Sequence, residues 1–204
     1  MKLFYAPGAC SIGIHVLLEE IGKPYETTAL NLREGEQYKP FFSDVNPKAK
    51  VPALVRDDGS VLTEFPAIAY YLARTNPDQK LLPDDIEGQV RCLELIDYIV
   101  ATIHMQGFSR IIRPTNFAPN AIDEDHVKAR GVELATKGFA VLDRALAGRD
   151  YLLGTFSIAD AALFYVEFWA RRLAVTLPEN CVAHLERMLA RPAVKATLAA
   201  EGLG

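Results

Sequence analysis

The chain has 204 residues, half of them hydrophobic and 24% charged, with a formal net charge of −4, so it fits one or two ordinary globular domains and offers no concentrated basic surface for nucleic acid. No apolar run approaches the roughly 18 residues of a membrane span, and no signal-peptide core opens the chain. The three cysteines are widely spaced, so we expect neither a disulfide framework nor a metal site, and a reducing, cytoplasmic compartment.

The first 74 residues mix strand-like and helix-like patterns. An amphipathic helix is predicted up to residue 21, because its apolar residues recur at i, i+3, i+4 and i+7 before Gly22. The turn Asp57-Asp58-Gly59-Ser60 predicts a hairpin, and a helix follows over about 65–74. A strand–helix–strand unit pairs its strands in parallel and a hairpin pairs them antiparallel, so the order βαβ-ββα predicts a mixed four-stranded sheet. The predicted strands span 2–6, 25–32, 53–55 and 61–63.

Residues 75–87 are polar and contain two prolines, which indicates a linker. Beyond it nearly all of the sequence has helical periodicity, with Arg191-Pro192 expected to end the helix marked by Val182, Leu185 and Leu189. One of these helices is apolar throughout and is expected to be buried. The predicted domains are therefore 1–74 and an all-helical 88–204. The predicted helices span about 88–108, 127–146, 157–174 and 182–189.

Cys10 and Ser11 stand where the loop after the first strand meets the first helix. A helix N-terminus presents unpaired N–H groups and the positive end of the helix dipole. The thiolate of Cys10, or that of a bound thiol, would be stabilised there, and cysteines in such places can have pKa values well below about 8.5. A small buried hydrophobe is the alternative interpretation of Cys10. Position alone does not choose between them.

Two further segments could contact a ligand. If the Val51-Pro52 bond is cis, the N–H and C=O of Val51 point outward and can pair with an extended peptide, although a simple strand-starting proline is the commoner case. Glu64 stands at a helix start, where the dipole alone favours an acid. With the neighbouring N–H groups it could also hold the ammonium and carboxylate of a ligand.

Two patterns in the second half give weaker evidence of a functional site. Asp97, Ala101 and His104 fall on one face of the long helix, a spacing also common on exposed helices. Ser157 and Asp160 match a capping box, which starts a helix and has no catalytic role.

Taken together, these segments closely resemble the glutathione transferase family, in particular its bacterial beta class, over the whole length of the chain. The family's fold is a thioredoxin-like N-terminal domain followed by an all-helical C-terminal domain, which agrees with the two halves described above. The segments that carry the resemblance are Phe4-Tyr5-Ala6-Pro7-Gly8-Ala9-Cys10-Ser11, Val45-Asn46-Pro47-Lys48, Val51-Pro52-Ala53-Leu54, Leu62-Thr63-Glu64, Phe156-Ser157-Ile158-Ala159-Asp160, Arg191-Pro192 and Ala200-Glu201-Gly202.

The resemblance implies roles for residues of the first half. Cys10 would contact the glutathione sulfur and can form a mixed disulfide, and Ser11 would add a hydroxyl. Val51, before the family's cis-proline Pro52, would pair with the cysteinyl backbone of glutathione. Glu64 and Phe65 would hold the γ-glutamyl end. Because a phenylalanine side chain cannot donate a hydrogen bond, only the backbone N–H of Phe65 can serve there.

The helical half departs further from the family. Aligning it from one end places His104 on the beta-class histidine, and aligning it from the other end places Met105 there. The one extra residue between these anchors is what a π-bulge absorbs. His104 is preferred because its helical spacing places it with Asp97 and Ala101, the other ligand-facing positions. Asp97 stands where relatives often have Asn, and Arg33 is the candidate for holding the glycyl carboxylate.

The implied activity is that of an alkyl or aryl transferase, which conjugates the glutathione thiolate to hydrophobic electrophiles in detoxification. The electrophile would lie against Phe108, Ile112 and Trp169. Glutathione would be the co-substrate, without a metal, and the family implies a homodimer. Two alternatives stay open: a thiol-disulfide oxidoreductase acting through a mixed disulfide at Cys10, and a non-catalytic ligand-binding homologue.

Overall fold

A computed structural model describes all 204 residues and divides them into two units. The first unit joins Met1–Asp84 to Leu189–Gly204, and the second is Asp85–Met188. This differs from the expected helical domain, which ran to the C-terminus. The sequence Arg191-Pro192 ends the helix before it, as predicted, but a further helix that was not predicted follows at once. Proline is well suited to the first position of a helix, and here it begins α9 (Pro192–Ala200), which packs on α1 (Ser11–Ile21).

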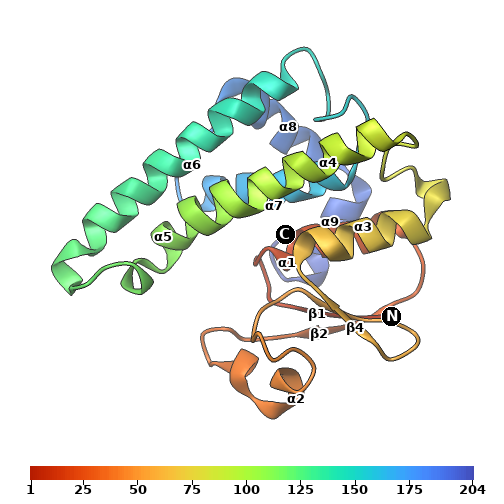
Figure 1. The fold of residues 1–204 in the computed structure, drawn as a ribbon, viewed down its shortest axis with the longest axis horizontal. Coiled ribbons are helices and arrows are strands. Elements are labelled where there is room, and N and C mark those ends of the chain that lie inside the picture. Colours follow the sequence, from red (N-terminus) through yellow and green to blue (C-terminus); the bar gives the residue numbers. More distant parts are fainter. The chain divides into compact units, whose positions relative to one another are not determined.

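The first unit contains a four-stranded mixed sheet (Figure 1), as predicted. Its order is β2-β1-β3-β4. The first two strands are parallel and the others pair antiparallel. The register pairs Lys2 with Glu26 and Phe4 with Ala53. The strands are β1 (Lys2–Tyr5), β2 (Glu26–Ala29), β3 (Ala53–Val55) and β4 (Val61–Thr63).

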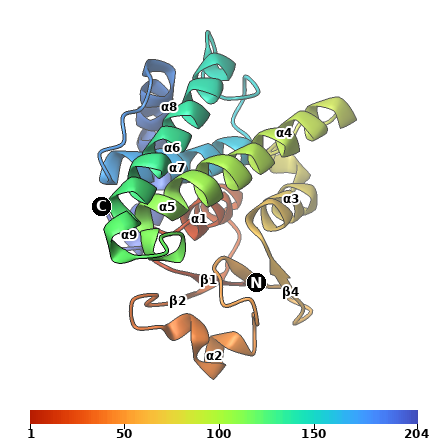
Figure 2. The same cartoon turned by 60° about the vertical axis from the view of Figure 1, so that its left-hand side comes forward.

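Helices cover both faces of this sheet. Figures 1 and 2 show α1 and α3 (Phe65–Thr75) on one face and the short α2 (Pro40–Ser43) on the other. On the α2 side, a small apolar core forms around the rings of Phe4 and Phe42, whose centroids lie 5.4 Å apart. Two single-turn 3₁₀ segments, η1 (Glu36–Tyr38) and η2 (Pro77–Gln79), complete the unit.

The ends of α1 follow the sequence signals. The helix starts directly after Cys10, and Gly22 ends it in the left-handed conformation with φ 69°. The Gly22 N–H donates to the carbonyl of Leu18 at 3.1 Å, closing the last turn. The loop that carries Cys10 therefore leads directly into a buried helix whose last turn is closed by Gly22.

The regular elements of the second unit are all helices. The predicted helix over 88–108 is in fact two elements, because the ten residues of η3 form a π-helix. A π-type insertion was predicted here, and the π segment is longer than a single bulge. The elements are α4 (Ile86–Tyr98), η3 (Ile99–Phe108), α5 (Ser109–Ile112), η4 (Pro114–Asn116), η5 (Ala121–Asp123), α6 (Glu124–Leu146), α7 (Ile158–Arg172) and α8 (Glu179–Ala190).

Close packing of α6 on η3 depends on a glycine. A Cβ added to Gly138 would lie 2.5 Å from Cγ1 of Ile103, closer than carbon atoms can approach. The absence of a side chain at Gly138 therefore lets the wider π-helix lie directly on α6.

α7 is the buried centre of this unit, as its composition predicted. Asp160 closes the predicted capping box with Ser157 at its N-terminus. The fully buried His184 of α8 then joins two acids of α7, with Nδ1 at 2.8 Å from Glu167 and Nε2 at 3.3 Å from Asp160. Burial alone would lower the pKa of His184, but the two carboxylates outweigh it and raise the pKa to about 9. No helix in the structure has the length and apolarity to cross a bilayer.

Candidate functional site

Cys10 lies beside the backbone of Val51 in the first unit. The Cys10 thiol donates to the carbonyl oxygen of Val51, with Sγ at 3.4 Å. The Val51-Pro52 peptide bond is cis. The start of α1 and the segment before β3, far apart in the sequence, thus bring a sulfur and a peptide edge together. Such an edge could pair with the backbone of a peptide-like ligand.

The pKa of Cys10 does not follow the expectation from its place at a helix start. Burial raises the pKa to about 12, the backbone N–H groups of Cys10 and Ser11 lower it, Glu64 raises it and Lys50 lowers it. Burial wins because loss of solvation penalises a thiolate more than the available donors stabilise it. In this structure Cys10 is therefore a thiol at neutral pH, able to donate a hydrogen bond.

The hydroxyl of Ser11 forms hydrogen bonds with main-chain groups of Ala6. It accepts a hydrogen bond from the Ala6 N–H at 3.2 Å and donates to the Ala6 carbonyl at 3.3 Å, and the residue is fully buried. These contacts close the loop between β1 and α1. A ligand sulfur would meet this hydroxyl only if they were broken.

The loop that carries Cys10 is also held from the C-terminus. Glu201 follows α9, and its carboxylate accepts a hydrogen bond from the Gly8 N–H at 2.8 Å. Its other oxygen lies 2.9 Å from Nδ1 of His15 in α1. His15 and Glu201 are both buried. Sequence reasoning missed this cluster, although a histidine on the apolar face of α1 was a visible signal.

Glu64 faces a lysine that sequence reasoning did not select. Lys48 Nζ lies 2.6 Å from Oε1 of Glu64 and 2.9 Å from the hydroxyl of Thr63. Glu64 has φ 71°, a conformation that non-glycine residues rarely adopt. The next residue, Phe65, is almost completely buried, and Arg33 has an exposed side chain.

The remaining predicted residues lie in the second unit. His104 is half-buried: its Nδ1 lies 3.3 Å from the Tyr165 hydroxyl, and its ring packs on Trp169 at 4.8 Å. Phe108 packs on the same indole at 5.5 Å and is fully buried. The predicted electrophile contact that presents exposed surface is Ile112, since Trp169 is also buried.

The π-helix changes which side chains share a face. His104 was preferred on α-helical spacing, but η3 begins two residues after Asp97. Asp97, Ala101 and Met105 are all exposed, whereas His104 is not. Which of His104 and Met105 meets a ligand stays a prediction.

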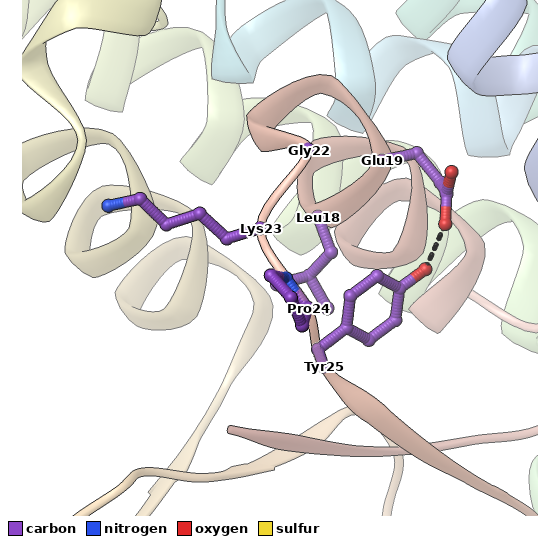
Figure 3. Close-up of a pocket in the computed structure, with 6 residues that line it drawn as sticks. All are labelled: Leu18, Glu19, Gly22, Lys23, Pro24 and Tyr25. Carbon is purple, nitrogen blue, oxygen red and sulfur yellow. Dashed lines mark hydrogen bonds between the residues drawn. The ribbon is translucent and has the colours of Figure 1, made fainter.

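A shallow hollow of about 320 Å³ lies at the C-terminal end of α1 (Figure 3). Its polar side is formed by the Tyr25 hydroxyl and the Glu19 carboxylate, and the hydroxyl donates a hydrogen bond to that carboxylate. None of the predicted site residues lines it, so it is separate from the Cys10 site. No group of His, Cys, Asp and Glu side chains is placed to hold a metal ion. The lining residues are Leu18, Glu19, Gly22, Lys23, Pro24 and Tyr25.

Comparison with known proteins gives a consistent result. Family models described as "Glutathione S-transferase, N-terminal domain" and "Glutathione S-transferase, C-terminal domain" match residues 8–75 and 125–196. The glutathione S-transferase GstA of Escherichia coli O157:H7 is 38% identical, with 100% of both chains covered. A solved glutathione S-transferase from Xylella fastidiosa has a TM-score of 0.91 at 27% identity, covering 100% of this chain and 99% of its own. A sphingomonad glutathione S-transferase complexed with glutathione has a TM-score of 0.85 at 36% identity, with both chains fully covered.

Proposed function

This chain belongs to the glutathione S-transferase family, and from that premise we propose that it binds glutathione at Cys10 and Val51 and conjugates its thiolate to hydrophobic electrophiles. The chain is a transferase. The observation that supports this site is the 3.4 Å contact between Cys10 Sγ and the Val51 carbonyl. A cysteine beside a peptide edge suits a ligand that carries its own thiol on a peptide backbone.

Cys10 acts as a hydrogen-bond donor in this proposal. The bound glutathione thiol loses its proton to solvent, and its thiolate accepts hydrogen bonds from the Cys10 S–H and from N–H groups at the start of α1. Donors aimed at a developing anion in a site shielded from water stabilise it strongly. The thiolate then attacks the electrophilic carbon, forming a C–S bond and releasing the leaving group where there is one.

The raised pKa of Cys10 disfavours thiol-disulfide exchange as the main activity. To form a mixed disulfide, the Cys10 thiolate attacks a disulfide substrate such as glutathione disulfide, breaks its S–S bond and releases the other half as a thiolate. Burial raises the pKa of Cys10 to about 12, so the thiolate is scarce at neutral pH. Non-catalytic ligand binding is disfavoured in turn by the family assignment as a transferase.

Finer assignments are part of the proposal. Membership of the beta class rests on Cys10 at the start of α1. The roles of Arg33, Glu64 and Phe65 toward glutathione stay predictions, as do those of Asp97, Ala101 and His104. The electrophile contacts and a homodimeric assembly are also predictions.

The test compares wild type with Cys10→Ala and Cys10→Ser. We expect Cys10→Ala to lower the conjugation rate with an aromatic halide by at least about tenfold, and the serine variant, which keeps a donor, to retain more. A pH series should show a higher pKa for the bound glutathione thiol in the alanine variant. Unchanged turnover and unchanged glutathione affinity in Cys10→Ala would contradict the proposal. Disulfide exchange with hydroxyethyl disulfide that outpaces conjugation would favour the redox alternative.

A further inference from the structure

Two aromatic residues of α7 hold the imidazole ring of His104. Tyr165 and Trp169 are four residues apart and therefore lie on the same face of that helix. The His104 ring packs edge-to-face on both, with its centroid 5.6 Å from that of Tyr165 and 4.8 Å from that of Trp169. The Tyr165 hydroxyl lies 3.3 Å from Nδ1 of His104. Because Tyr165 and Trp169 are both buried, these contacts fix the orientation of the imidazole.

The contact with Tyr165 also selects one tautomer of His104. A neutral imidazole has one nitrogen that donates a hydrogen bond and one that accepts. Of the two groups, the phenol hydroxyl is the better donor and the imidazole nitrogen the better acceptor, because the nitrogen has the higher affinity for a proton. Tyr165 therefore donates to Nδ1. The proton of the neutral imidazole is then on Nε2, since a partner at one ring nitrogen determines the state of the other.

The surroundings of His104 have the character of a ligand site. The residue lies in the π-helix η3, and π-helical segments are frequent at functional sites. Phe108, at the end of the same element, packs on the other side chain that holds His104, with its centroid 5.5 Å from that of Trp169. Sites for small molecules combine apolar and aromatic walls with a few precisely placed polar groups. The half-buried imidazole is such a polar group among aromatic rings.

We propose that Tyr165 is a positioning residue for conjugation: its hydroxyl keeps the His104 proton on Nε2, and the Nε2–H group donates to an oxygen of the electrophile. The inference rests on the proposed function and goes beyond it, because it identifies the class of electrophile that the site favours. These are molecules in which the reacting carbon is conjugated to a nitro or carbonyl group.

The chemistry of such electrophiles explains why a donor is useful. When the glutathione thiolate attacks a nitro-substituted aryl halide, the C–S bond forms and an electron pair of the ring moves onto the nitro oxygens. The pair returns to the ring as the carbon–halogen bond breaks, and the halide leaves with its bonding electrons. A donor aimed at those oxygens stabilises charge that is absent from the ground state, so it raises kcat.

The test is a double-mutant cycle with Tyr165→Phe and His104→Ala on the full chain. The electrophiles are 1-chloro-2,4-dinitrobenzene, whose nitro groups accept the charge, and iodomethane, which has no such group. The control Tyr98→Phe removes a hydroxyl from a partly buried tyrosine of the same unit. We measure kcat and KM for each electrophile at saturating glutathione. In parallel, ¹⁵N NMR reports the tautomer of His104, whose signals are assigned by their absence from His104→Ala.

We expect Tyr165→Phe to lower kcat for the dinitrobenzene by about tenfold with little change in KM, because the lost interaction forms only in the transition state. Turnover of iodomethane should change by less than about twofold, and Tyr98→Phe should change neither. In the His104→Ala background, Tyr165→Phe should have no further effect, since it acts through His104. The NMR spectra should show a proton on Nε2 in wild type and a mixture of tautomers in Tyr165→Phe.

Three results would overturn the proposal. Equal losses for the two electrophiles, or additive effects of the two substitutions, would mean that Tyr165 acts on the fold alone. A wild-type His104 with its proton on Nδ1 would contradict the assigned direction of the hydrogen bond. Wild type that conjugates neither electrophile would instead overturn the proposed function itself.

Discussion

The carboxylate of Glu201 lies 2.8 Å from the backbone nitrogen of Gly8, two residues before Cys10. The same carboxylate contacts His15 one turn into α1. A single side chain near the C-terminus therefore holds both ends of the segment that carries the candidate catalytic cysteine. The Glu201 carboxylate and His15 are buried, and the Gly8 contact is partly so. Losing the carboxylate would leave a donor without its partner, and an unpaired buried donor costs more free energy than the hydrogen bond contributes.

We expect Glu201→Gln to reduce the free energy of unfolding by about 1–3 kcal/mol and to lower kcat/KM for conjugation. The amide keeps the shape of the side chain but removes its charge and one acceptor. Urea denaturation measures the first effect and steady-state kinetics the second. The control is Glu186→Gln, since Glu186 makes an exposed ion pair with Arg171 and should change neither quantity. Full activity in a destabilised Glu201→Gln would show that Glu201 stabilises the fold without positioning Cys10.

Alkylation of Cys10 in the ligand-free chain should speed up steadily with pH. Its pKa is raised to about 12 by burial, and only the thiolate reacts. Iodoacetamide labelling, with Cys10 followed by peptide mass spectrometry, should show no plateau up to about pH 10. The fully buried Cys92 and Cys181 serve as internal controls that label only on unfolding. A plateau below about pH 8 would mean that Cys10 is an activated thiolate.

Stability should fall in alkali because of His184. The two carboxylates raise its pKa above the unfolded value of about 6.5 to about 9. Its contribution is therefore complete below the unfolded pKa and is lost as pH rises through the folded one. Burial raises the pKa of Glu167 to about 7, which has the same sign. We expect wild type to lose on the order of 3 kcal/mol between about pH 6.5 and pH 10.

Urea denaturation across this pH range measures that loss, and His184→Gln should flatten the curve. If the variant does not fold, ¹⁵N NMR of wild type replaces it: both imidazole nitrogens should carry protons at neutral pH. A neutral His184 at that pH would refute the assignment.

Gly138→Ala should destabilise the chain by about 1–3 kcal/mol, because overpacking forces neighbouring atoms apart. The added Cβ would meet Ile103 in η3 at 2.5 Å. Ile103→Ala removes the atoms that it would meet. The double variant should therefore be more stable than the sum of the two single effects predicts, as thermal unfolding can measure. Simple additivity would mean that α6 and η3 move apart without strain.

The sheet could be predicted from sequence because its signals are local. The turn at residues 57–60 determined the hairpin, and the observed β3 (Ala53–Val55) and β4 (Val61–Thr63) have the predicted bounds. The apolar stripe before Gly22 located α1 in the same way. Each of these elements is specified by residues that lie within it or close to it in the sequence.

α9 could not be predicted because a proline signals both the end and the start of a helix. What decides between them is a surface on which the helix can bury its apolar side. Val194 is fully buried and Leu198 nearly so, and the partner helix α1 lies almost the whole chain away. No local pattern contains that information.

Two properties of the candidate site depended on tertiary structure. The helix start allowed a lowered pKa for Cys10 as one of two interpretations, and burial beside Val51 raises the pKa instead. Lys48 lies in a segment that carried the family resemblance, yet nothing in its neighbours indicated that it would meet Glu64. Charges and solvation at a site depend on which distant segments fold against it.

Residues 189–204 belong to the first unit although they are synthesised after the second. The first unit can therefore complete its fold only after the second has been synthesised. During synthesis the sheet and α1 emerge early, but Gly8 must wait for Glu201, which follows it by 193 residues. The matched N-terminal segment 8–75 consequently leaves out Glu201, which holds the loop that carries Cys10. Removing residues 189–204 would therefore damage the environment of Cys10 at the start of α1.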